Sequence, residues 1–328
     1  MIATITLNPA IDKTMNIGKL NLGEVNRMDS VRNIAGGKGI NVTKVLRQYN
    51  YDVKALGLLG NNSGQIISDC LVNIGALDAL TRVPGDVRTS TNIVSDDGMV
   101  TELLEPGPDI TESDRLRFLD EFEENIKDCE YVIISGSAPK GILPDIYADL
   151  TMIAKSYGVK VILDASGENL KSGIKAKPYM IKPNLKELTQ LTGIEFDGFE
   201  SIAKTVTDLI RSGISNVLVS MGADGIIYGK YEARSADMDE DKLQGKIKIV
   251  KVSAPRLEVV NSVGSGDSAV AAFAMADSEG LRMEDIAKKC VAISAANVLT
   301  LENGVIDMAA ATEIEKNLKI QDSMHIEF

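Results

Sequence analysis

Hydrophobic and polar positions alternate along the chain in blocks that predict strands and helices in turn. Short apolar runs typical of buried strands occur at residues 3–7, 53–59 and 131–135. Longer segments with apolar residues at helical spacing, such as 40–49 and 112–127, predict amphipathic helices. Strands that alternate with helices at this spacing indicate a mostly parallel sheet covered by helices on both faces. The pattern therefore predicts an α/β protein.

The same alternation continues along the rest of the chain, with one irregular stretch. Residues 234–250 are charged and show little periodicity, and we interpret them as a surface excursion. Further strands are expected at 159–163, 179–182, 216–221 and 226–229, and further helices at 65–74, 144–157, 185–191, 199–212, 285–299 and 309–318.

Two polar stretches do not fit this alternation. Residues 13–34 alternate in polarity and contain glycine turns, and residues 88–104 are typical of a hairpin around Asp97-Gly98. We interpret both as parts of a smaller β element that is inserted into the main domain. The expected division is a main domain of residues 1–12, 35–87 and 105–328, and a β lid of residues 13–34 and 88–104.

The composition argues against several classes of protein. The 328 residues carry a net charge of −12 and include no Trp, which disfavours binding to a nucleic acid backbone or stacking on its bases. The N-terminal segment resembles a short strand and not a signal peptide, and no apolar run reaches membrane-spanning length. The three cysteines are far apart and encode neither a disulfide framework nor a CxxC metal site. We expect a soluble cytoplasmic protein with no nucleic acid or membrane partner.

The chain contains a single histidine, His325, close to its C-terminus. A Ser-His-Asp triad, a Cys-His pair or a His-rich metal site would have to use this tail residue. We therefore set these mechanisms aside.

A glycine-rich turn at Gly264-Ser265-Gly266-Asp267 is the main candidate for a chemical site, because it leads into the small-residue run 269–276. The first N–H groups of a helix lack partners inside it, and the helix dipole makes that end positive. Glycines let a bulky anion approach these donors, and an adjacent carboxylate can take a proton from an attacking hydroxyl. The simpler alternative is a glycine turn with Asp267 as helix N-cap.

Three further clusters lie at predicted strand ends or helix starts. Lys38, in Gly36-Gly37-Lys38-Gly39, could hold an anion at a helix N-terminus or could be a solvated loop lysine. This cluster lacks the spacing of a Walker loop, and no GxGxxG follows the first strand. Asn184 and Glu187 have the spacing of a capping box, which is a structural alternative to a ligand site. Residues 220–225 fit an ordinary turn at a strand end.

Taken together, six motifs resemble the ribokinase-like (PfkB) family of sugar kinases, in the family's order and over nearly the whole chain. They are TLNPAID at 6–12, GGKGINV at 36–42, SGSAP at 135–139, KPNLKE at 182–187, SMGADG at 220–225 and VGSGDS at 263–268. TLNPAID, the lysine of GGKG and TELLEPGP at 101–108 look like the phosphosugar branch, which includes 1-phosphofructokinase and tagatose-6-phosphate kinase. The resemblance implies a doubly wound, mostly parallel sheet flanked by helices, with a small β-sheet lid. It also implies a homodimer formed through the lid.

The resemblance assigns roles to the matching positions. Asp267 would be the general base, and the backbone amides of Gly264, Ser265 and Gly266 would form the anion hole. Asn184 and Glu187 would organise Mg²⁺ through water beside the phosphates of ATP, and a monovalent cation is a further cofactor to consider. The other expected site residues are Lys182, Ser220, Gly222, Gly225 and Asn297 at the nucleotide, and Asp12, Gly37, Lys38, Asn41 and Ser137 at the sugar phosphate.

One departure from the family concerns the substrate phosphate. Related phosphosugar kinases carry Thr-Arg-x-Asn in the second lid hairpin, and the arginine binds the phosphate. If Asn92 is that asparagine, Ser90 stands at the arginine position and Arg88 is the nearest arginine. Either Arg88 binds the phosphate, or Lys38 and Arg27 do.

The sequence thus predicts an ATP- and Mg²⁺-dependent phosphosugar kinase. Fructose 1-phosphate is the leading expected substrate, giving fructose 1,6-bisphosphate, and tagatose 6-phosphate is the alternative. A non-catalytic sugar-phosphate sensor is a remote second hypothesis, since such a protein is expected to lose the base or the Asn-x-x-Glu pair. A nicotinamide-dependent oxidoreductase would need the dinucleotide fingerprint that is absent.

Overall fold

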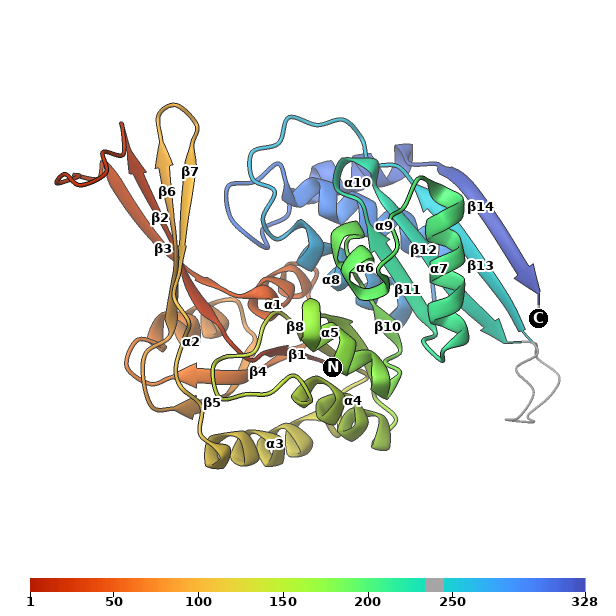
Figure 1. Ribbon diagram of the computed structural model, residues 1–328, viewed down its shortest axis with the longest axis horizontal. Helices are drawn as coiled ribbons and strands as arrows, with labels where there is room; N and C mark the ends of the chain where they lie inside the picture. The colour runs from red at the N-terminus through yellow and green to blue at the C-terminus, as the bar shows by residue number, and fades with distance from the viewer. Residues whose placement is uncertain (234–244, 328) are drawn as a thin grey trace.

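The computed structural model describes residues 1–233 and 245–327 of the chain. These residues form two separate sheets, one of ten strands and one of four. The large sheet runs through the main body, and the small sheet projects from one side of it (Figure 1). The expected α/β class, with a mostly parallel sheet between helices and a second small sheet, is confirmed.

The large sheet has the strand order β14-β13-β12-β11-β10-β9-β8-β1-β4-β5. All neighbours from β11 to β5 pair in parallel, and β12, β13 and β14 extend the sheet as antiparallel strands. Helices on both faces bury the central parallel strands, which explains why they occur in the sequence as continuous apolar runs. The strands are β1 (Ile2–Thr6), β4 (Val53–Gly60), β5 (Leu77–Val83), β8 (Tyr131–Ser135), β9 (Lys160–Asp164), β10 (Met180–Ile181), β11 (Asn216–Ser220), β12 (Ile226–Ala233), β13 (Gly245–Val252) and β14 (Ile320–Glu327).

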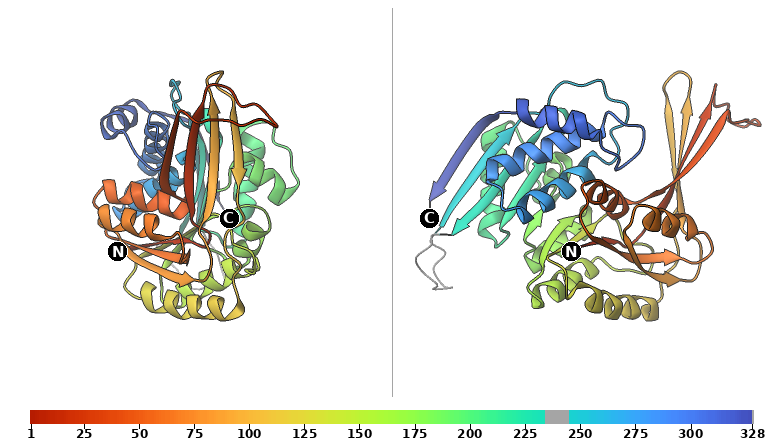
Figure 2. Two further views of the ribbon diagram at one scale, coloured as in Figure 1. Left: turned by 90° about the vertical axis from the view of Figure 1, so that its left-hand side faces the viewer. Right: turned by 180° about the vertical axis from the view of Figure 1, so that it is seen from behind.

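Two layers of helices cover the large sheet, one on each face (Figure 2). Each layer packs an apolar core against one set of alternate strand residues. The first layer contains α1 (Lys38–Gln48), α2 (Gln65–Asn73), α8 (Ser265–Ser278), α9 (Met283–Asn297) and α10 (Met308–Asn317), and the second contains α3 (Glu112–Ile126), α4 (Ile146–Ser156), α5 (Gly167–Gly173), α6 (Leu185–Thr192) and α7 (Phe199–Arg211).

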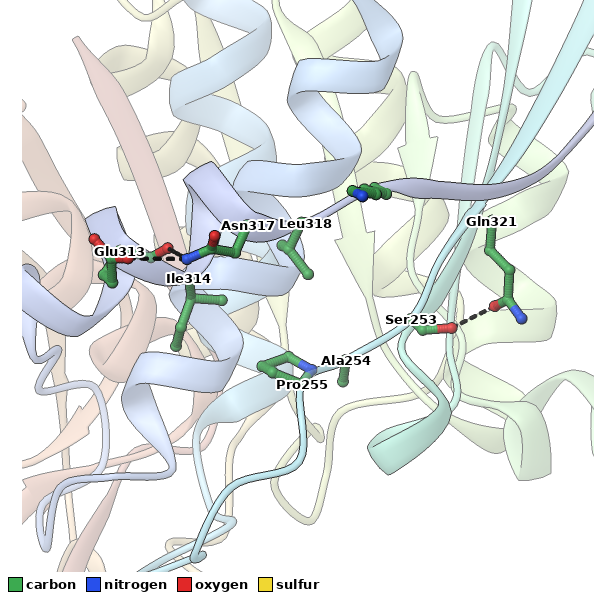
Figure 3. A pocket seen from close by; sticks show the side chains of 9 residues that line it. Ser253, Ala254, Pro255, Glu313, Ile314, Asn317, Leu318 and Gln321 are labelled. Carbon is green, nitrogen blue, oxygen red and sulfur yellow. Dashed lines mark hydrogen bonds between the residues drawn. The ribbon is translucent and has the colours of Figure 1, made fainter.

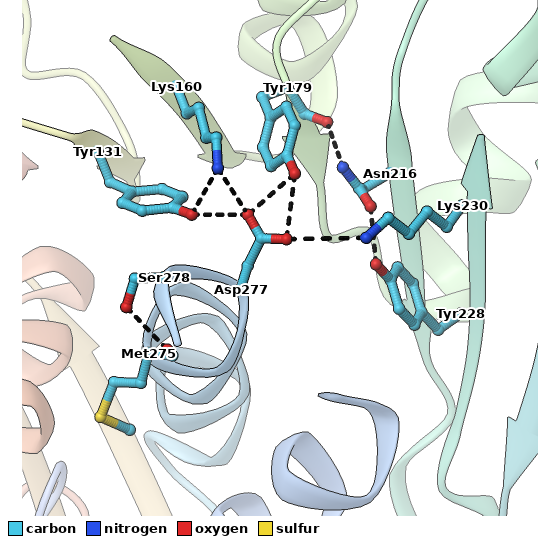
Figure 4. Close-up of polar contacts among 9 residues, drawn as sticks. All are labelled: Tyr131, Lys160, Tyr179, Asn216, Tyr228, Lys230, Met275, Asp277 and Ser278. Atoms are coloured by element: carbon cyan, nitrogen blue, oxygen red, sulfur yellow. Dashed lines mark hydrogen bonds and ion pairs between the residues drawn. The ribbon is translucent and has the colours of Figure 1, made fainter. Parts of the chain in front are cut away.

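Helix α8 lies inside the first layer, and every residue from 267 to 276 is buried. Its small side chains let it pack closely against α1 and α9. Its far end is fixed by a polar cluster around Asp277 (Figure 4). Asp277 Oδ2 accepts hydrogen bonds from Tyr131 at 2.6 Å, Tyr179 at 2.9 Å and Lys160 at 3.1 Å. The cluster holds the C-terminal end of α8 at the amino ends of β8 and β9, where Tyr131 and Lys160 lie, opposite the turn that begins the helix.

The small sheet has the order β3-β2-β6-β7. Strand β2 pairs antiparallel with β3 and parallel with β6, while β6 and β7 form a hairpin. The strands are β2 (Ala10–Ile17), β3 (Ser30–Gly36), β6 (Arg88–Ser95) and β7 (Val100–Leu104). Because β2 follows β1 and β3 leads into α1, the base of the small sheet lies at the carboxyl end of β1.

Four observed elements differ from the sequence prediction. Strand β5 and helix α5 occupy segments for which no element was expected, and so does β14. The interpretation of 234–250 as a surface excursion is wrong for residues 245–250, which belong to β13, while 234–244 lie outside the described residues. Strand β13 alternates lysines with buried isoleucines, and this period-two pattern was hidden by the overall charge of the stretch.

Candidate active site

Buried polar atoms without partners gather at the edge of the large sheet where its parallel strands end. Within the described part of the chain, five buried side-chain oxygens have no hydrogen-bond partner: Thr6 Oγ1, Asn8 Oδ1, Asn41 Oδ1, Ser135 Oγ and Asp164 Oδ2. They lie at or just beyond the carboxyl ends of β1, β8 and β9, and in the first turn of α1. Native proteins rarely leave buried polar atoms unpaired, and open α/β sheets bind ligands at this edge. The edge is therefore the candidate active site.

The turn at Gly264–Gly266 brings the N-terminus of α8 to this edge. Gly264 has φ 85°, a left-handed conformation that favours glycine, and a side chain there would also crowd the Gly304 backbone at 3.1 Å. A Cβ on Gly266 would lie 3.1 Å from Lys182 Nζ. Ser265 is held by a hydrogen bond from its hydroxyl to the Ser262 carbonyl at 3.0 Å. Because Gly264 and Gly266 carry no side chains, the first amides of α8 are open to an anion.

Asp267 lies in the first turn of α8 and is only 5% exposed. Its Oδ2 accepts a hydrogen bond from Asn41 Nδ2 at 2.9 Å. Burial, reinforced by the charge of Asp164, raises the pKa of Asp267 to about 6, although Lys38, Asn41 and Lys182 oppose the rise. A carboxylate with this pKa is ionised at neutral pH and basic enough to accept a proton.

Asp164, which the sequence analysis did not single out, is the buried centre of this site. Its Oδ1 lies 3.1 Å from Lys182 Nζ and 3.4 Å from Lys38 Nζ. Burial alone would raise the pKa of Asp164, but the two ammonium groups outweigh burial and hold it below its ordinary value. The same carboxylate raises the pKa of Lys38. The only local indication in the sequence is a carboxylate directly after a buried strand, which many α/β proteins share.

The residues expected at the sugar phosphate lie around the base of the small sheet. Asp12 is in β2, and a side chain at Gly36 would overlap its carboxylate. Gly37 has φ 105° and caps α1, so that Lys38 and Asn41 project from the first turn. Asn41 points to Asp267, as described above, and is 3% exposed. The structure therefore brings Asp12, Lys38 and Asn41 to the same edge.

Arg88, Arg27 and Ser137 take different positions relative to this group. In the register of the small sheet Arg88 is opposite Ala10 and Ser90 is opposite Asp12, so that Arg88, Ser90 and Asp12 share one face. Arg88 Nε donates to the Asn8 carbonyl at 3.1 Å. Ser137 is exposed just after β8. Arg27 is exposed in the connection between β2 and β3, at the far end of the small sheet, so the structure does not bring it to Asp12.

The residues expected at the nucleotide lie along the ends of β10 and β11. Asn184 and Glu187 form a complete capping box, since Asn184 Oδ1 accepts from the Glu187 amide and Glu187 Oε2 from the Asn184 amide, both at 2.8 Å. Asn184 also pairs with Ser220 in an isolated parallel bridge. Gly222 and Gly225 have φ 59° and 87°, so the turn between them depends on glycine.

Asn297 has a different environment from the one expected. It is completely buried, so it does not face a nucleotide. Its Nδ2 donates to the Val263 carbonyl at 2.9 Å, and its Oδ1 accepts from the Ser268 hydroxyl and the Gly304 amide, both at 3.1 Å. All its polar atoms are therefore used to support the glycine turn from behind.

The described residues contain no group of three or more His, Cys, Asp or Glu that could hold a metal ion by themselves. Mg²⁺ fits such a site differently, since it keeps several waters and binds one or two carboxylates together with substrate phosphates. Glu187 has one carboxylate oxygen outside its capping-box bond, and Asp164 Oδ2 is unpaired. The donor set at the strand edge is therefore compatible with a water-bound Mg²⁺.

A further pocket of about 510 Å³ lies where the chain leaves β13, next to the backbone that a side chain on Gly225 would meet (Figure 3). It is lined by Ser253, Ala254 and Pro255 after β13, and by residues of α10 and the start of β14. None of the expected site residues lines it. The candidate site is therefore defined by the polar edge of the sheet and not by this pocket.

Comparison with known proteins identifies the class to which this site belongs. The model of the pfkB family of carbohydrate kinases matches residues 5–306. The chain therefore belongs to the pfkB family of carbohydrate kinases, and it is a sugar kinase, as the motifs predicted.

Two relatives and one solved protein illustrate the similarity. The tagatose-6-phosphate kinases of two strains of Staphylococcus epidermidis are 34% and 33% identical, each over 98% of this chain and 99% of the relative. Phosphofructokinase-2 from Escherichia coli, solved in complex with potassium, has a TM-score of 0.85 with 23% identity, over 96% of this chain and 98% of the other. The structural comparison supports the fold.

None of the helices in the described residues has both the length and the apolar character of a membrane span.

Proposed function

We propose that this kinase transfers the γ-phosphoryl group of ATP to a hydroxyl of a ketohexose phosphate. The position of Asp267 beside the open amides of α8 carries the proposal. This arrangement places a proton acceptor next to an anion site, which is what phosphoryl transfer to a hydroxyl requires. Tagatose 6-phosphate is the first substrate to test because two relatives bear its name. Fructose 1-phosphate, which the sequence motifs favoured, is the second.

In this mechanism Asp267 accepts the proton of the attacking hydroxyl. Asn41 orients the carboxylate through its hydrogen bond to Oδ2. The amides of Gly264, Ser265 and Gly266 stabilise the charge that develops on the transferred group. Lys182 and Lys38, held by Asp164, add positive charge at the same place.

The nucleotide would lie along the turn at Ser220, Gly222 and Gly225, with Lys182 at its phosphates. When bound, Mg²⁺ neutralises phosphate charge and orients the transferred group. Asn184 and Glu187 would hold it through water. A monovalent cation is also to be tested, because the E. coli phosphofructokinase-2 structure is a potassium complex.

The sugar phosphate would lie between the base of the small sheet and the first turn of α1. Asp12 would accept hydrogen bonds from its hydroxyls, and Gly37, which has a left-handed conformation close to Thr6 and Pro9, would hold the start of α1 beside it. Lys38 and Arg88 are cations available to its phosphate. Ser137 is exposed and follows Gly136, which lies beside the Lys38 side chain. Arg27 would reach it only from a second subunit.

We also propose that the small sheet is both the lid of the site and the contact surface of a homodimer. Every residue of β7 is exposed, including Val100 at 60%, Leu103 at 55% and Leu104 at 60%. Val31 of β3, on the other edge, is 51% exposed. Exposed apolar residues gathered on one small sheet indicate an interaction surface. Light scattering of the wild type and of Leu104→Glu tests this, and a monomeric wild type contradicts it.

The proposed reaction is tested by coupled ADP release with Mg-ATP. The panel contains tagatose 6-phosphate, fructose 1-phosphate, fructose 6-phosphate, fructose and ribose. Turnover on one phosphosugar far above the free sugars supports the proposal and names the substrate. Higher turnover on free sugars contradicts the phosphosugar assignment, and binding of phosphosugars without ADP formation favours the sensor.

A further inference from the structure

We propose that Asn303, in the loop between α9 and α10, is a positioning residue that sets the Asp12 carboxylate for the sugar phosphate. Asn303 Nδ2 donates to Asp12 Oδ2 at 3.0 Å, across 291 positions of the chain. The bond leaves the other carboxylate oxygen, Oδ1, for a substrate hydroxyl. The inference rests on the proposed function, because it takes Asp12 as a residue that binds the sugar.

The orientation of the Asn303 amide is fixed from its other end. Asn303 Oδ1 accepts a hydrogen bond from Asn261 Nδ2 at 2.9 Å, so the NH₂ group must point to Asp12. Asn303 is only 9% exposed. The next residue, Gly304, has φ 72°, and a side chain there would lie 2.8 Å from the Asn41 carbonyl. The loop is therefore held tightly against α1, and Asn303 has little freedom to turn away.

The charges around Asp12 make this donor important. Burial raises the pKa of Asp12, and Glu102 of β7 acts in the same direction. The hydrogen bond from Asn303, together with Lys44 of α1 and Arg88 of β6, opposes the rise. Lys44 already donates to the Ala35 carbonyl and Arg88 to the Asn8 carbonyl. Within the described residues, Asn303 makes the one side-chain hydrogen bond to the Asp12 carboxylate. Its loss therefore leaves the ionised form of Asp12 less stable.

The same loop connects Asp12 with the glycine turn of α8. Asn261 Oδ1 accepts from the Val263 amide at 3.0 Å, while Asn297 Nδ2 donates to the Val263 carbonyl at 2.9 Å. The residue that precedes the turn is thus held by two asparagines, one of which also holds Asn303. Asn303 therefore belongs to a hydrogen-bond network that contacts both Asp12 and the turn before Asp267.

The test compares Asn303→Ala and Asn303→Asp with the wild type, using the full chain. Asn303→Asp is isosteric and keeps the acceptor for Asn261, but it replaces the donor to Asp12 by a second carboxyl group, which disfavours the ionised form of Asp12. Glu302→Gln is the matched control, because it alters the adjacent residue of the same loop and only its ion pair with Arg32. Calorimetry measures the Kd of the sugar phosphate that the activity panel identifies, from pH 5 to 8, and separately the Kd of ATP. Melting temperatures report folding.

We expect both Asn303 variants to weaken sugar-phosphate binding by about tenfold or more, the effect of losing a hydrogen bond to a charged group. The ATP Kd should change less than twofold, and the acid limb of sugar binding should move to higher pH. In an Asp12→Asn background, Asn303→Ala should cost less than twofold. If Asn303→Ala does not fold, sugar-phosphate binding by the isosteric Asn303→Asp tests the inference instead.

Sugar binding unchanged in a folded Asn303 variant overturns the inference, and so does an equal loss of sugar and ATP binding, which indicates a general structural role. A wild-type enzyme inactive on every phosphosugar, or an Asp12→Asn variant that binds normally, contradicts the proposed function itself. An active wild type with an impaired Asp12→Asn and a normal Asn303→Asp contradicts only the role of Asn303.

Discussion

Lys182 Nζ lies 3.1 Å from Asp164 Oδ1, and the two side chains are 4% and 0% exposed. Lys38 lies 3.4 Å from the same oxygen, so two cations share one carboxylate. The two lysines therefore carry one more charge than Asp164 does, and this surplus acts on Asp267 and the open amides of α8. A chain with a net charge of −12 needs such a local cluster to attract anionic substrates.

Asp164→Asn should destabilise the protein strongly, because it leaves buried Lys182 without its counter-charge. Breaking a buried ion pair from one side costs about 3–5 kcal/mol. Because the pKa of Asp164 is held below its ordinary value, this contribution is present above about pH 4 and is lost as the pH falls further. Urea unfolding at pH 7 and pH 3 measures both effects. Asp128→Asn, which removes a 59%-exposed partner of Lys54, is the control and should cost less than about 1 kcal/mol.

Asp267→Asn should lower kcat by about 10²–10⁴, the usual contribution of a positioned base, while ATP still binds. The same change should raise the melting temperature at pH 8. The pKa of Asp267 rises from 3.8 to about 6 in the folded protein, so ionising this buried group costs stability as the pH rises through that window. The stabilisation should disappear near pH 4. Normal turnover by the variant would remove Asp267 from its proposed role.

The kcat of the wild type should decrease as the pH is lowered through about 6 if Asp267 is the base, because protonation of Asp267 at its raised pKa removes the proton acceptor. Rate measurements from pH 5 to 9 at saturating substrates check this. A profile that stays flat down to pH 5 contradicts the assignment.

Gly266→Ala should displace Lys182, because the new Cβ would lie 3.1 Å from Nζ. Removal of one oxyanion donor lowers kcat by about 10²–10³. A Cβ beside the amides that begin α8 should have an effect of this order. Gly198→Ala is the matched control, since its Cβ would meet nothing within 4 Å and its backbone is extended. Steady-state kinetics of both variants compare them. Equal kcat values in the two would indicate that the turn does not bind the transferred group.

Arg88→Ala should raise the KM of the sugar phosphate by about tenfold or more, with the KM of ATP unchanged. The reason is its place on the same face of the small sheet as Asp12. Arg27→Ala serves as the control, because Arg27 lies at the far end of that sheet. An effect of Arg27→Ala instead would show that the phosphate is bound by the lid of a second subunit.

Much of the large sheet could be predicted because its parallel strands are buried on both faces. The central strands β1, β4 and β8 are apolar runs for this reason, and the alternation with helices gave the class. Strands β13 and β14 could not be predicted in the same way. Their outer positions are polar, and β14 acquires its conformation from pairing with β13.

The site was predictable where a local motif specifies a backbone shape, as in the turn before Asp267. Asp164 and Asn303 have no such motif. Each is important through partners that lie far away in the sequence, Lys38 for the first and Asp12 for the second. Asn297 shows the converse, since its sequence position suggested a ligand contact while its burial shows a supporting role.

The pairing of β14 with β13 has a consequence for the behaviour of the protein in solution. Strand β13 presents Ile247 and Ile249 on its buried face, and β14 occupies the backbone groups along its outer side. In β14 the positions Gln321, Ser323, His325 and Glu327 are exposed. An unpaired apolar strand edge is a template for intermolecular pairing, whereas a polar one resists it. Removal of residues 320–327 should therefore produce a kinase that aggregates during expression, although every residue proposed for catalysis is still present.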